Sequence, residues 1–298
     1  MLALKNVRSF KKSFLPLVLS SAILIVTLYY FTADEPEVTQ ELMPGAVEYW
    51  QETFPAQTAS YLRTGEMEPT PHGGSVPYQK LTAYPFMRAM YHGFGFWFDF
   101  RESRGHIHAV EDTLITGRAK FGGVCWACKS ADYPALTADY GQEEFDTMFW
   151  SEAADKAKHP VSCIDCHDPQ SPGFALRLTR PWLEEAITAQ GQTLADFDLR
   201  SLTCAQCHSE YYFEGPGTAN KVVFPWTVGF RPEDALAHYD AEGFSDWIHP
   251  RTGAGVLKVQ HPEFEFFQGS VHANFGLSCV DCHMPRIQDA QGNEFTQH

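Results

Sequence analysis

The chain has 298 residues, of which 44% are hydrophobic, so it is long enough to bury the core of one large or two modest domains. Its formal net charge of −15 at pH 7 argues against nucleic acid and acidic lipid as partners. The same charge means that an anionic substrate must be attracted by a local group of positive side chains.

The N-terminus has the pattern of an export signal. A basic segment, residues 1–12, precedes an apolar run over residues 13–32 that is long enough to cross a bilayer. The run lacks a clean cleavage site, and it ends in Tyr29 and Tyr30, which suit a membrane interface. We therefore favour an uncleaved signal anchor over a removed signal peptide. Residues 33–45 are acidic and polar and are expected to be a tether, with one domain over residues 46–298 outside the cytoplasm or in the periplasm.

Regular structure is predicted to be mainly α, in short helices joined by loops, with little β-structure. Helices are expected to begin at Thr179–Glu185, ending near Gly191, and at Pro232. A third is expected to begin at His261–Glu263, with His261 as its N-cap. Lys221–Phe224 is the one convincing strand-like stretch.

All eight cysteines lie in four C-x-x-C pairs. C-x-x-C-H is the signature of covalent haem c attachment, and it occurs at Cys163–His167, Cys204–His208 and Cys279–His283. On a helical turn, residues i, i+3 and i+4 share a face, so two thiols can bond the porphyrin while the next residue reaches the iron. The spacing predicts four haems bound by this chain.

The remaining pair, which is the first of the four motifs in chain order, lies at Cys125–Lys129 and has a lysine where the histidine would stand. A neutral lysine amine can ligate iron, and an iron ligated in this way differs from bis-histidine irons that only relay electrons. We infer that Lys129 marks the haem where chemistry occurs. The alternative is a surface lysine beside a disulfide or half of a zinc site, but neither explains why histidine follows the other three pairs.

These motifs occur in a set that resembles the ammonia-forming cytochrome c nitrite reductases. The similarity runs from Tyr84 to His298 and includes four further stretches, Cys207–Phe213, Lys221–Trp226, Leu257–Glu263 and Cys282–Pro285. The resemblance implies a multihaem cytochrome c whose core is built around covalent haems. It also implies six-electron reduction of nitrite to ammonium at a lysine-ligated haem with one open face, fed by bis-histidine relay haems.

The resemblance assigns further site residues. Tyr211 and His261 match a tyrosine and a histidine that surround the open face, and histidine suits proton donation near neutral pH. Calcium beside the active haem is implied through the side chains of Glu210 and Gln260 and the backbone carbonyls of Tyr211 and Lys258.

The resemblance also assigns the haem ligands to positions of this sequence. Distal ligands are expected at His106, His272 and His298, with His108 as a rival to His106. The covalent and proximal positions are Cys125, Cys128, Lys129, Cys163, Cys166, His167, Cys204, Cys207, His208, Cys279, Cys282 and His283.

The sequence departs from the family pattern near the active haem. The family has an arginine where this chain has Ile115, which cannot bind an anion. Arg118, three residues further on, is assigned the vacated role, with Arg104, or no cation at all, as the alternatives.

The sequence also ends earlier than the family pattern, which continues with a fifth haem motif and C-terminal helices that form a homodimer. We expect the chain to be the N-terminal part of such a reductase, which receives electrons from a membrane or periplasmic cytochrome or quinol dehydrogenase. One alternative is a four-haem electron-transfer protein without substrate chemistry. Another is a related multihaem hydroxylamine or sulfite reductase.

Overall fold

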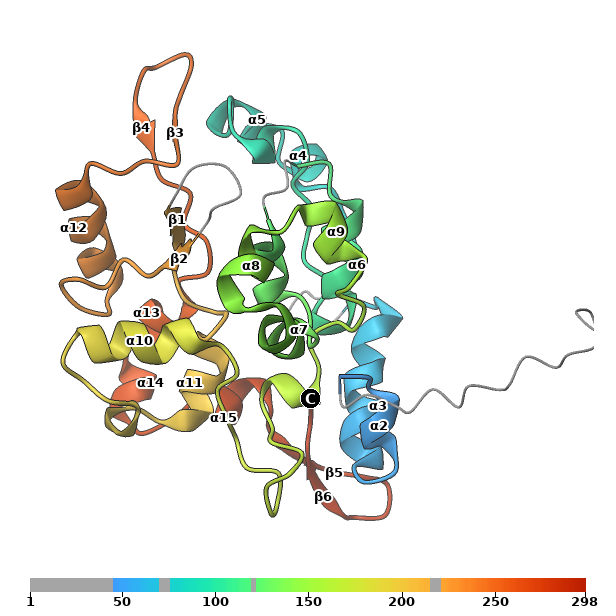
Figure 1. Cartoon of the computed structure of the whole chain (residues 1–298). Helices are drawn as coiled ribbons and strands as arrows, with labels where there is room; N and C mark the ends of the chain where they lie inside the picture. Colours follow the sequence, from blue (N-terminus) through green and yellow to red (C-terminus); the bar gives the residue numbers. More distant parts are fainter. Residues whose placement is uncertain (1–44, 70–75, 119–121, 215–220) are drawn as a thin grey trace, which may run out of the picture. The chain divides into compact units, whose positions relative to one another are not determined.

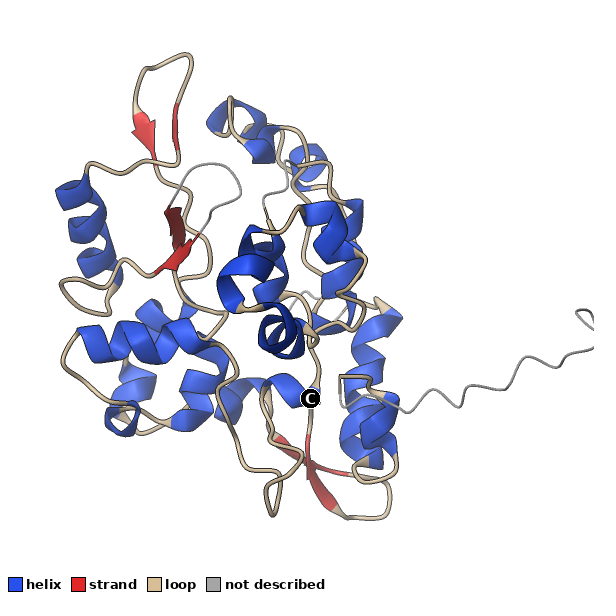
Figure 2. Ribbon diagram, viewed as in Figure 1, coloured by secondary structure: helices blue, strands red, loops and turns tan. Residues whose placement is uncertain are grey.

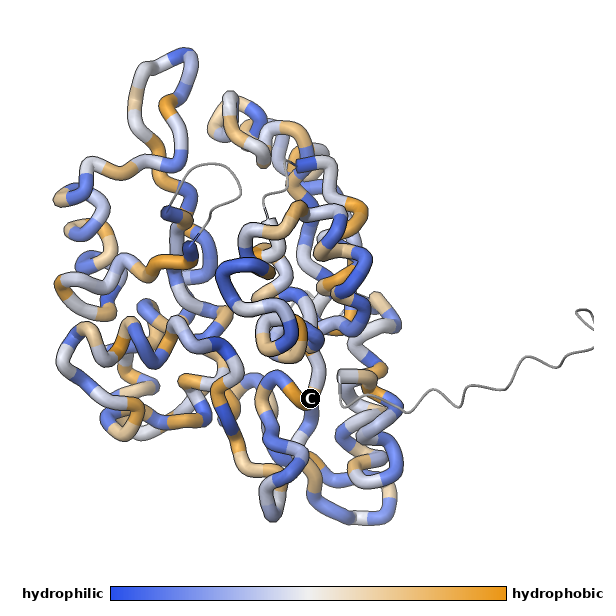
Figure 3. The backbone as a smooth tube through the Cα atoms, viewed as in Figure 1, coloured by the Kyte–Doolittle hydropathy of each residue, from blue (hydrophilic) through white to orange (hydrophobic). Residues whose placement is uncertain are grey.

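A computed structural model describes residues 45–69, 76–118, 122–214 and 221–298 (Figure 1). The expected anchor, residues 13–32, and the expected tether, residues 33–45, lie outside the described residues except for residue 45. Hydrophobic and hydrophilic stretches alternate over short distances along the described chain (Figure 3). Within these ranges, no helix combines the length and the apolar character needed to cross a membrane.

The described chain is mainly helical, as predicted, and most helices are short and joined by irregular loops (Figure 2). The α-helices are α2 (Glu48–Gln51), α3 (Pro55–Arg63), α4 (Lys80–Ala83), α5 (Met87–Met90), α6 (Ala109–Ile115), α7 (Tyr133–Tyr140), α8 (Gln142–Thr147), α9 (Trp150–Ala154), α10 (Pro181–Ala189), α11 (Leu199–Ala205), α12 (Pro232–Glu242), α13 (Glu263–Phe267), α14 (Val271–Asn274) and α15 (Cys279–His283). Short 3-10 helices are η1 (Thr64–Glu66), η2 (Gly95–Trp97), η3 (His106–His108), η4 (Gly123–Cys128), η5 (Cys163–Asp165) and η6 (Leu194–Asp196).

The β-structure consists of antiparallel pairs of two or three residues. Lys221–Phe224, the expected strand, contributes β2 (Lys221–Val223), which pairs with β1 (Tyr212–Glu214) directly after the third haem motif. The remaining strands are β3 (Trp247–Ile248), β4 (Gly255–Val256), β5 (Arg286–Gln288) and β6 (Glu294–Thr296). The last pair lies at the end of the chain and leads into His298.

Two of the three expected helix starts are confirmed. Pro181 and Pro232 open α10 and α12, and Gly191, with φ of 73°, follows α10 in the left-handed conformation. The third expectation was wrong by one residue, because Pro262, not His261, caps α13. A residue before proline is disfavoured in the helical region, so His261 stays in the preceding loop.

The buried core gathers around the first C-x-x-C pair. Trp126, between the two cysteines, is 0% exposed and stacks on Trp150 with ring centroids 5.7 Å apart. The core cluster comprises Trp126, Ala127, Tyr133, Phe145, Ala153, Ala154, Ala157, Trp182, Leu183, Ile187, Leu202, Ala205, Phe224, Trp226 and Phe264. Residues of α7 to α11 and of α13 therefore belong to the same buried cluster as Trp126 and Ala127 of the motif that carries Lys129.

One glycine permits this packing. Gly123 opens η4, and a Cβ atom placed on it would lie 2.0 Å from the carbonyl oxygen of Phe145. Its own N–H donates to the carbonyl of Met148 at 3.0 Å, so the two backbones are in direct contact. No side chain fits between them.

Gly123→Ala is therefore expected to lower the free energy of unfolding by at least about 2 kcal/mol, because a backbone segment must move. Urea denaturation of the haem-loaded protein measures the change. Gly65→Ala is the matched control, since the nearest atom to its Cβ would be a flexible methyl of Ile107 at 3.5 Å. Equal effects of the two substitutions would contradict the close backbone approach.

A buried carboxyl in the same core predicts a pH effect. Burial raises the pKa of Asp146 to about 6, although the Tyr133 hydroxyl, which donates to it at 2.6 Å, opposes the rise. The Asp146 carboxyl therefore binds its proton more tightly in the folded protein than in the unfolded chain. Below about pH 4 the carboxyl is protonated in both states and does not lower the free energy of unfolding. As the pH rises from there through about 6, it loses its proton in the folded protein as well, and the free energy of unfolding falls.

Asp146→Asn keeps an acceptor for Tyr133 and removes the charge. The variant should gain stability relative to the unmodified protein between pH 4 and pH 7, by about 2 to 3 kcal/mol. Urea titrations of both proteins across this range give the difference. A difference that does not vary with pH would show that Asp146 does not titrate in this way.

Candidate haem-binding active site

Each C-x-x-C motif forms a single helical turn with the expected geometry. In the second and third motifs the N–H of His167 and of His208 donates to the carbonyl of the first cysteine, at 2.8 Å in both. In the first motif the N–H of Lys129 donates to Trp126 at 3.0 Å. The residue after the second cysteine is thus fixed one turn from the first cysteine.

The first motif combines a buried middle with partly accessible reactive groups, of which Cys128 packs against the core cluster. Trp126 and Ala127 are buried, whereas Cys125, Cys128 and Lys129 are partly accessible. The eight cysteines are all free thiols. Among the described residues, the one group of three metal-ligating side chains is His208, His261 and Glu263, which contains no cysteine. The structure therefore gives no support to a zinc site built from two C-x-x-C pairs.

Several histidine pairs of the described chain have ring centroids between 5.7 and 6.2 Å apart, and two of these pairs join a haem-motif histidine to an expected distal ligand. The ring centroids of His167 and His298 are 6.2 Å apart, and those of His106 and His208 are 6.0 Å apart. Metal–nitrogen bonds of about 2 Å on each side of an iron would separate two imidazole centroids by about 6 Å. Both spacings therefore fit bis-histidine haem, although each pair joins distant parts of the sequence.

Hydrogen bonds orient the first of these pairs. His167 Nδ1 lies 2.7 Å from the carbonyl of Phe174, and His298 Nδ1 lies 2.8 Å from the carbonyl of Thr296. A carbonyl can only accept, so each Nδ1 carries the proton and each Nε2 has a free lone pair. Metal-ligating histidines are commonly held in this tautomer.

His106 and not its rival faces the third motif. His108 Nδ1 lies 3.3 Å from Glu111 Oε2, so its ring is directed to α6. His272 and His283 are both exposed, and neither makes a ring contact with another histidine of the described chain. The assignment of His272 stays a prediction.

Tyr211 packs against the core cluster that contains Trp126 of the first motif, and Arg118 interacts electrostatically with Tyr211 and with Cys125. Burial lowers the pKa of Arg118, while Asp99, Tyr211 and Cys125 raise it. Burial raises the pKa of Tyr211 well above its ordinary value, and the charge of Arg118 opposes this rise. Each side chain therefore acts electrostatically on the other, and Cys125 acts on both.

Arg104, the alternative cation, is already paired with two carboxylates. It forms ion pairs with Asp112 at 2.7 Å and with Glu111 at 2.8 Å. Arg104 and Ile115 line a cavity of about 380 Å³ whose described lining does not include Tyr211, His261 or Lys129. Arg118 is thus the arginine that the geometry favours for an anion at the first motif.

Two cations, Arg118 and Lys258, lie near the ring of Phe96. Arg118 lies over the ring of Phe96 at 4.4 Å, and the Lys258 ammonium lies 5.1 Å from the same centroid. Burial lowers the pKa of Lys258 to about 8; Glu210 raises it, and Arg118 lowers it further. A chain of net charge −15 thus has a local group of positive charge beside the first motif.

His261 lies between charged groups and not at a helix N-terminus. Its ring centroid is 5.7 Å from that of His208, and its Nδ1 is 3.8 Å from Glu263 Oε1. Hydrogen bonding to Glu263 raises the pKa of His261, but burial and the charge of Lys129 lower it below its ordinary value. His261 stands one residue before the N-cap of α13, not at the N-cap as expected.

Glu263 was not assigned a role from the sequence. Its carboxylate also lies 3.8 Å from His208 Nδ1, so it faces both imidazoles. Its position two residues after His261, in the first turn of α13, was the available signal.

The expected calcium ligands lie together. Glu210 is 4% exposed, and its carboxylate accepts from the Tyr239 hydroxyl at 2.9 Å and from the Gln260 N–H at 2.5 Å. Gln260 Oε1 accepts from the Lys258 ammonium at 2.9 Å. A buried carboxylate beside an amide oxygen is a donor set that a hard cation uses. Lys258 occupies one of the two lone pairs of Gln260 Oε1 and leaves the other for a cation.

Comparisons with known proteins agree on one family. The sequence model of cytochrome c552 matches residues 46–298. Cytochrome c-552 of Bacteroides thetaiotaomicron is 36% identical over 266 residues, covering 84% of this chain and 52% of that protein. Cytochrome c-552 of Porphyromonas gingivalis is 37% identical over 265 residues, with the same coverage. The chain therefore spans about half the length of the curated relatives it matches.

A solved structure is similar over the same region. It is the catalytic subunit of the cytochrome c nitrite reductase of Desulfovibrio desulfuricans, a protein with two calcium sites. The TM-score is 0.74 at 32% sequence identity, and the match covers 85% of this chain and 60% of that one.

The histidine geometry predicts different outcomes for two neighbouring substitutions. His106→Ala should remove the ligand opposite His208 and convert one low-spin haem to a high-spin form that binds added ligands. His108→Ala is the control and should leave every haem spin state unchanged. Electron paramagnetic resonance of the oxidised protein separates the two results. Conversion by His108→Ala, and not by His106→Ala, would reverse the assignment.

Proposed function

Because the chain belongs to the cytochrome c552 family, we propose that it is the catalytic part of an ammonia-forming nitrite reductase, in which Lys129 ligates the active iron. One observation carries the proposal. The motif with lysine in place of histidine is the motif that Arg118 and Tyr211 approach, while the second and third motifs each face a second histidine.

The residues present fit covalent haem. Two histidine pairs have the spacing of a bis-imidazole iron, and one pair has both Nε2 atoms free to bind it. Cys125 and Cys128 are accessible for thioether bonds, while the fold buries Trp126 between them. When bound, haem would supply the redox-active iron that takes up nitrite and passes electrons to it.

The residues around the first motif have complementary roles in this proposal. Arg118 binds and orients the nitrite anion by charge-assisted hydrogen bonds. His261 donates protons, which the six-electron reduction consumes, and Glu263 holds its ring in position. The Tyr211 hydroxyl, kept protonated by burial, donates a hydrogen bond to the bound anion. The calcium ligands Glu210 and Gln260 are connected to each other and fix the segments that carry Tyr211 and His261.

The wider setting is also proposed. Covalent haem attachment takes place outside the cytoplasm, which agrees with an export signal in residues 1–32 and with anchorage through residues 13–32. Electrons would come from a membrane or periplasmic cytochrome or quinol dehydrogenase. A fifth haem and a homodimer would belong to a longer chain, whereas His283 and the expected distal ligand His272 would hold relay haem of this chain.

The proposal is tested by nitrite turnover of the haem-loaded protein with a chemical electron donor. The unmodified protein should form ammonium. Lys129→His should keep its haem number by mass, because the cysteines are intact, and should lose most ammonium formation, because the axial ligand controls the iron. Electron exchange without ammonium formation by the unmodified protein would favour the electron-transfer alternative.

A paired substitution tests the anion site. Arg118→Gln should raise the nitrite concentration for half-maximal rate roughly ten- to hundredfold, since a charged hydrogen bond is lost. Arg104→Gln is the matched control, because its charge is already paired with Asp112 and Glu111, and it should leave that concentration unchanged. The reverse result would move the anion site to Arg104.

A further inference from the structure

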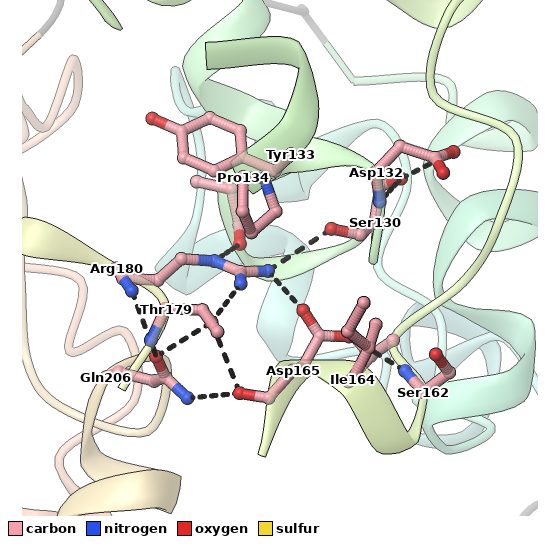
Figure 4. A network of polar contacts seen from close by, with 12 residues as sticks. Ser130, Asp132, Tyr133, Pro134, Ser162, Ile164, Asp165, Thr179, Arg180 and Gln206 are labelled. Carbon is pink, nitrogen blue, oxygen red and sulfur yellow. Dashed lines mark hydrogen bonds and ion pairs between the residues drawn. The ribbon is translucent and has the colours of Figure 1, made fainter. Parts of the chain in front are cut away.

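A single buried arginine connects the first and second motifs. Arg180 Nε donates to the carbonyl of Ala127 at 2.6 Å, and Nη2 donates to the carbonyl of Ser130 at 3.2 Å. Nη2 also lies 2.7 Å from Asp165 Oδ1 (Figure 4). Ala127 and Asp165 occupy the same place in their motifs, directly before the second cysteine.

The third motif joins the same network through the residue at that place, Gln206 (Figure 4). Gln206 Oε1 accepts from the backbone N–H groups of Thr179 at 2.9 Å and Arg180 at 3.2 Å. Its Nε2 donates to the carbonyl of Asp165 at 3.0 Å and to that of Thr203 at 2.9 Å. Three haem-binding turns are thus fixed against one another where α10 begins.

The network contains a desolvated pair of charges. The side chain of Arg180 is 1% exposed and that of Asp165 is 5% exposed. Burial lowers the pKa of Arg180, but Asp165 more than restores it, so the guanidinium stays charged. A buried ion pair is often no more stabilising than an apolar replacement, so stability alone does not account for this one.

The Arg180–Asp165 ion pair is oriented, with its positive group toward the first motif and its negative group in the second. Its positive end is bonded to the carbonyls of Ala127 and Ser130, on either side of Lys129. Its negative end is Asp165, which belongs to the second motif and also accepts from the Ser162 N–H at 2.8 Å. In a dry interior a nearby positive charge favours the reduced form of a redox centre, and a nearby negative charge favours the oxidised form.

We propose that Arg180 and Asp165 set the relative reduction potentials of the first two haems, so that an electron favours the Lys129-ligated iron over the iron of the second motif. Arg180 is therefore a positioning residue. It acts through its charge, and through hydrogen bonds and an ion pair that connect it to three motifs. The exchange is a one-electron transfer in which the second iron is oxidised as the first is reduced. The inference rests on the haem occupancy in the proposed function and not on nitrite turnover.

The fourth motif supplies a matched control. Asp281 stands at the same place in its motif and pairs with Arg200 at 3.4 Å, but the two side chains are 34% and 45% exposed. Water screens such a pair, so removing its charge should leave haem potentials almost unchanged.

The test is a spectroscopic redox titration of the haem-loaded protein and its Arg180→Gln and Asp165→Asn variants. The first haem is followed by its high-spin signal, and the second by the signal that His298→Ala converts. Arg180→Gln should lower mainly the first potential, and Asp165→Asn should raise mainly the second. The electron partition is the equilibrium ratio of reduced first haem to reduced second haem. Each variant should shift it at least tenfold toward the second haem, which corresponds to a change of about 59 mV in the difference between the two reduction potentials.

Controls separate charge from structure. Arg180→Lys keeps the charge and should retain the unmodified partition, and Asp281→Asn should not alter it. If Arg180→Gln does not fold, Asp165→Asn decides alone, since asparagine can still accept from Ser162. An unchanged partition in Asp165→Asn with full haem content would overturn the inference. Shifted potentials in a protein that makes no ammonium would support the inference while overturning the proposed function.

Discussion

The helical turn that carries each C-x-x-C pair is the constraint on which the rest of the structure depends. Within a turn, the bond from the N–H of His167 or His208 to the first cysteine fixes the axial ligand relative to both thiols. Between turns, short helices and small hairpins contribute little regular structure of their own. Most of the packing instead surrounds Trp126, and the network of Arg180 and Gln206 fixes the distances between three turns.

The few positive side chains of this acidic protein are unevenly placed. The chain is strongly acidic, yet Arg118 and Lys258 meet over Phe96 beside the first motif, and Lys129 lies close enough to lower the pKa of His261. Other arginines have their charge matched by acids, as Arg104 does with Asp112. Arg118 and Lys258 therefore bring two positive charges to one ring, where Asp99 and Glu210 act on them electrostatically.

The sequence predicted those features that depend on neighbouring residues. The motif turns, the helices opened by Pro181 and Pro232, and the strand at Lys221 all follow local rules. Contacts between distant segments could not be predicted in this way, because local rules do not say which segments meet in the fold. The resemblance pointed to His298, but only the structure places it opposite His167, and only the ion pairs of Arg104 distinguish it from Arg118. Arg180 gave no signal, because an arginine before a proline at a helix start is typical of a protein surface.

The central claim is that one haem has an open, lysine-ligated iron while the second and third are closed by histidine pairs. Electron paramagnetic resonance of the oxidised, haem-loaded protein during titration with nitrite tests this most directly. The account predicts one high-spin ferric signal that nitrite abolishes, with the low-spin signals of the two histidine pairs unaltered. A spectrum with only low-spin haems that do not respond to nitrite would contradict it.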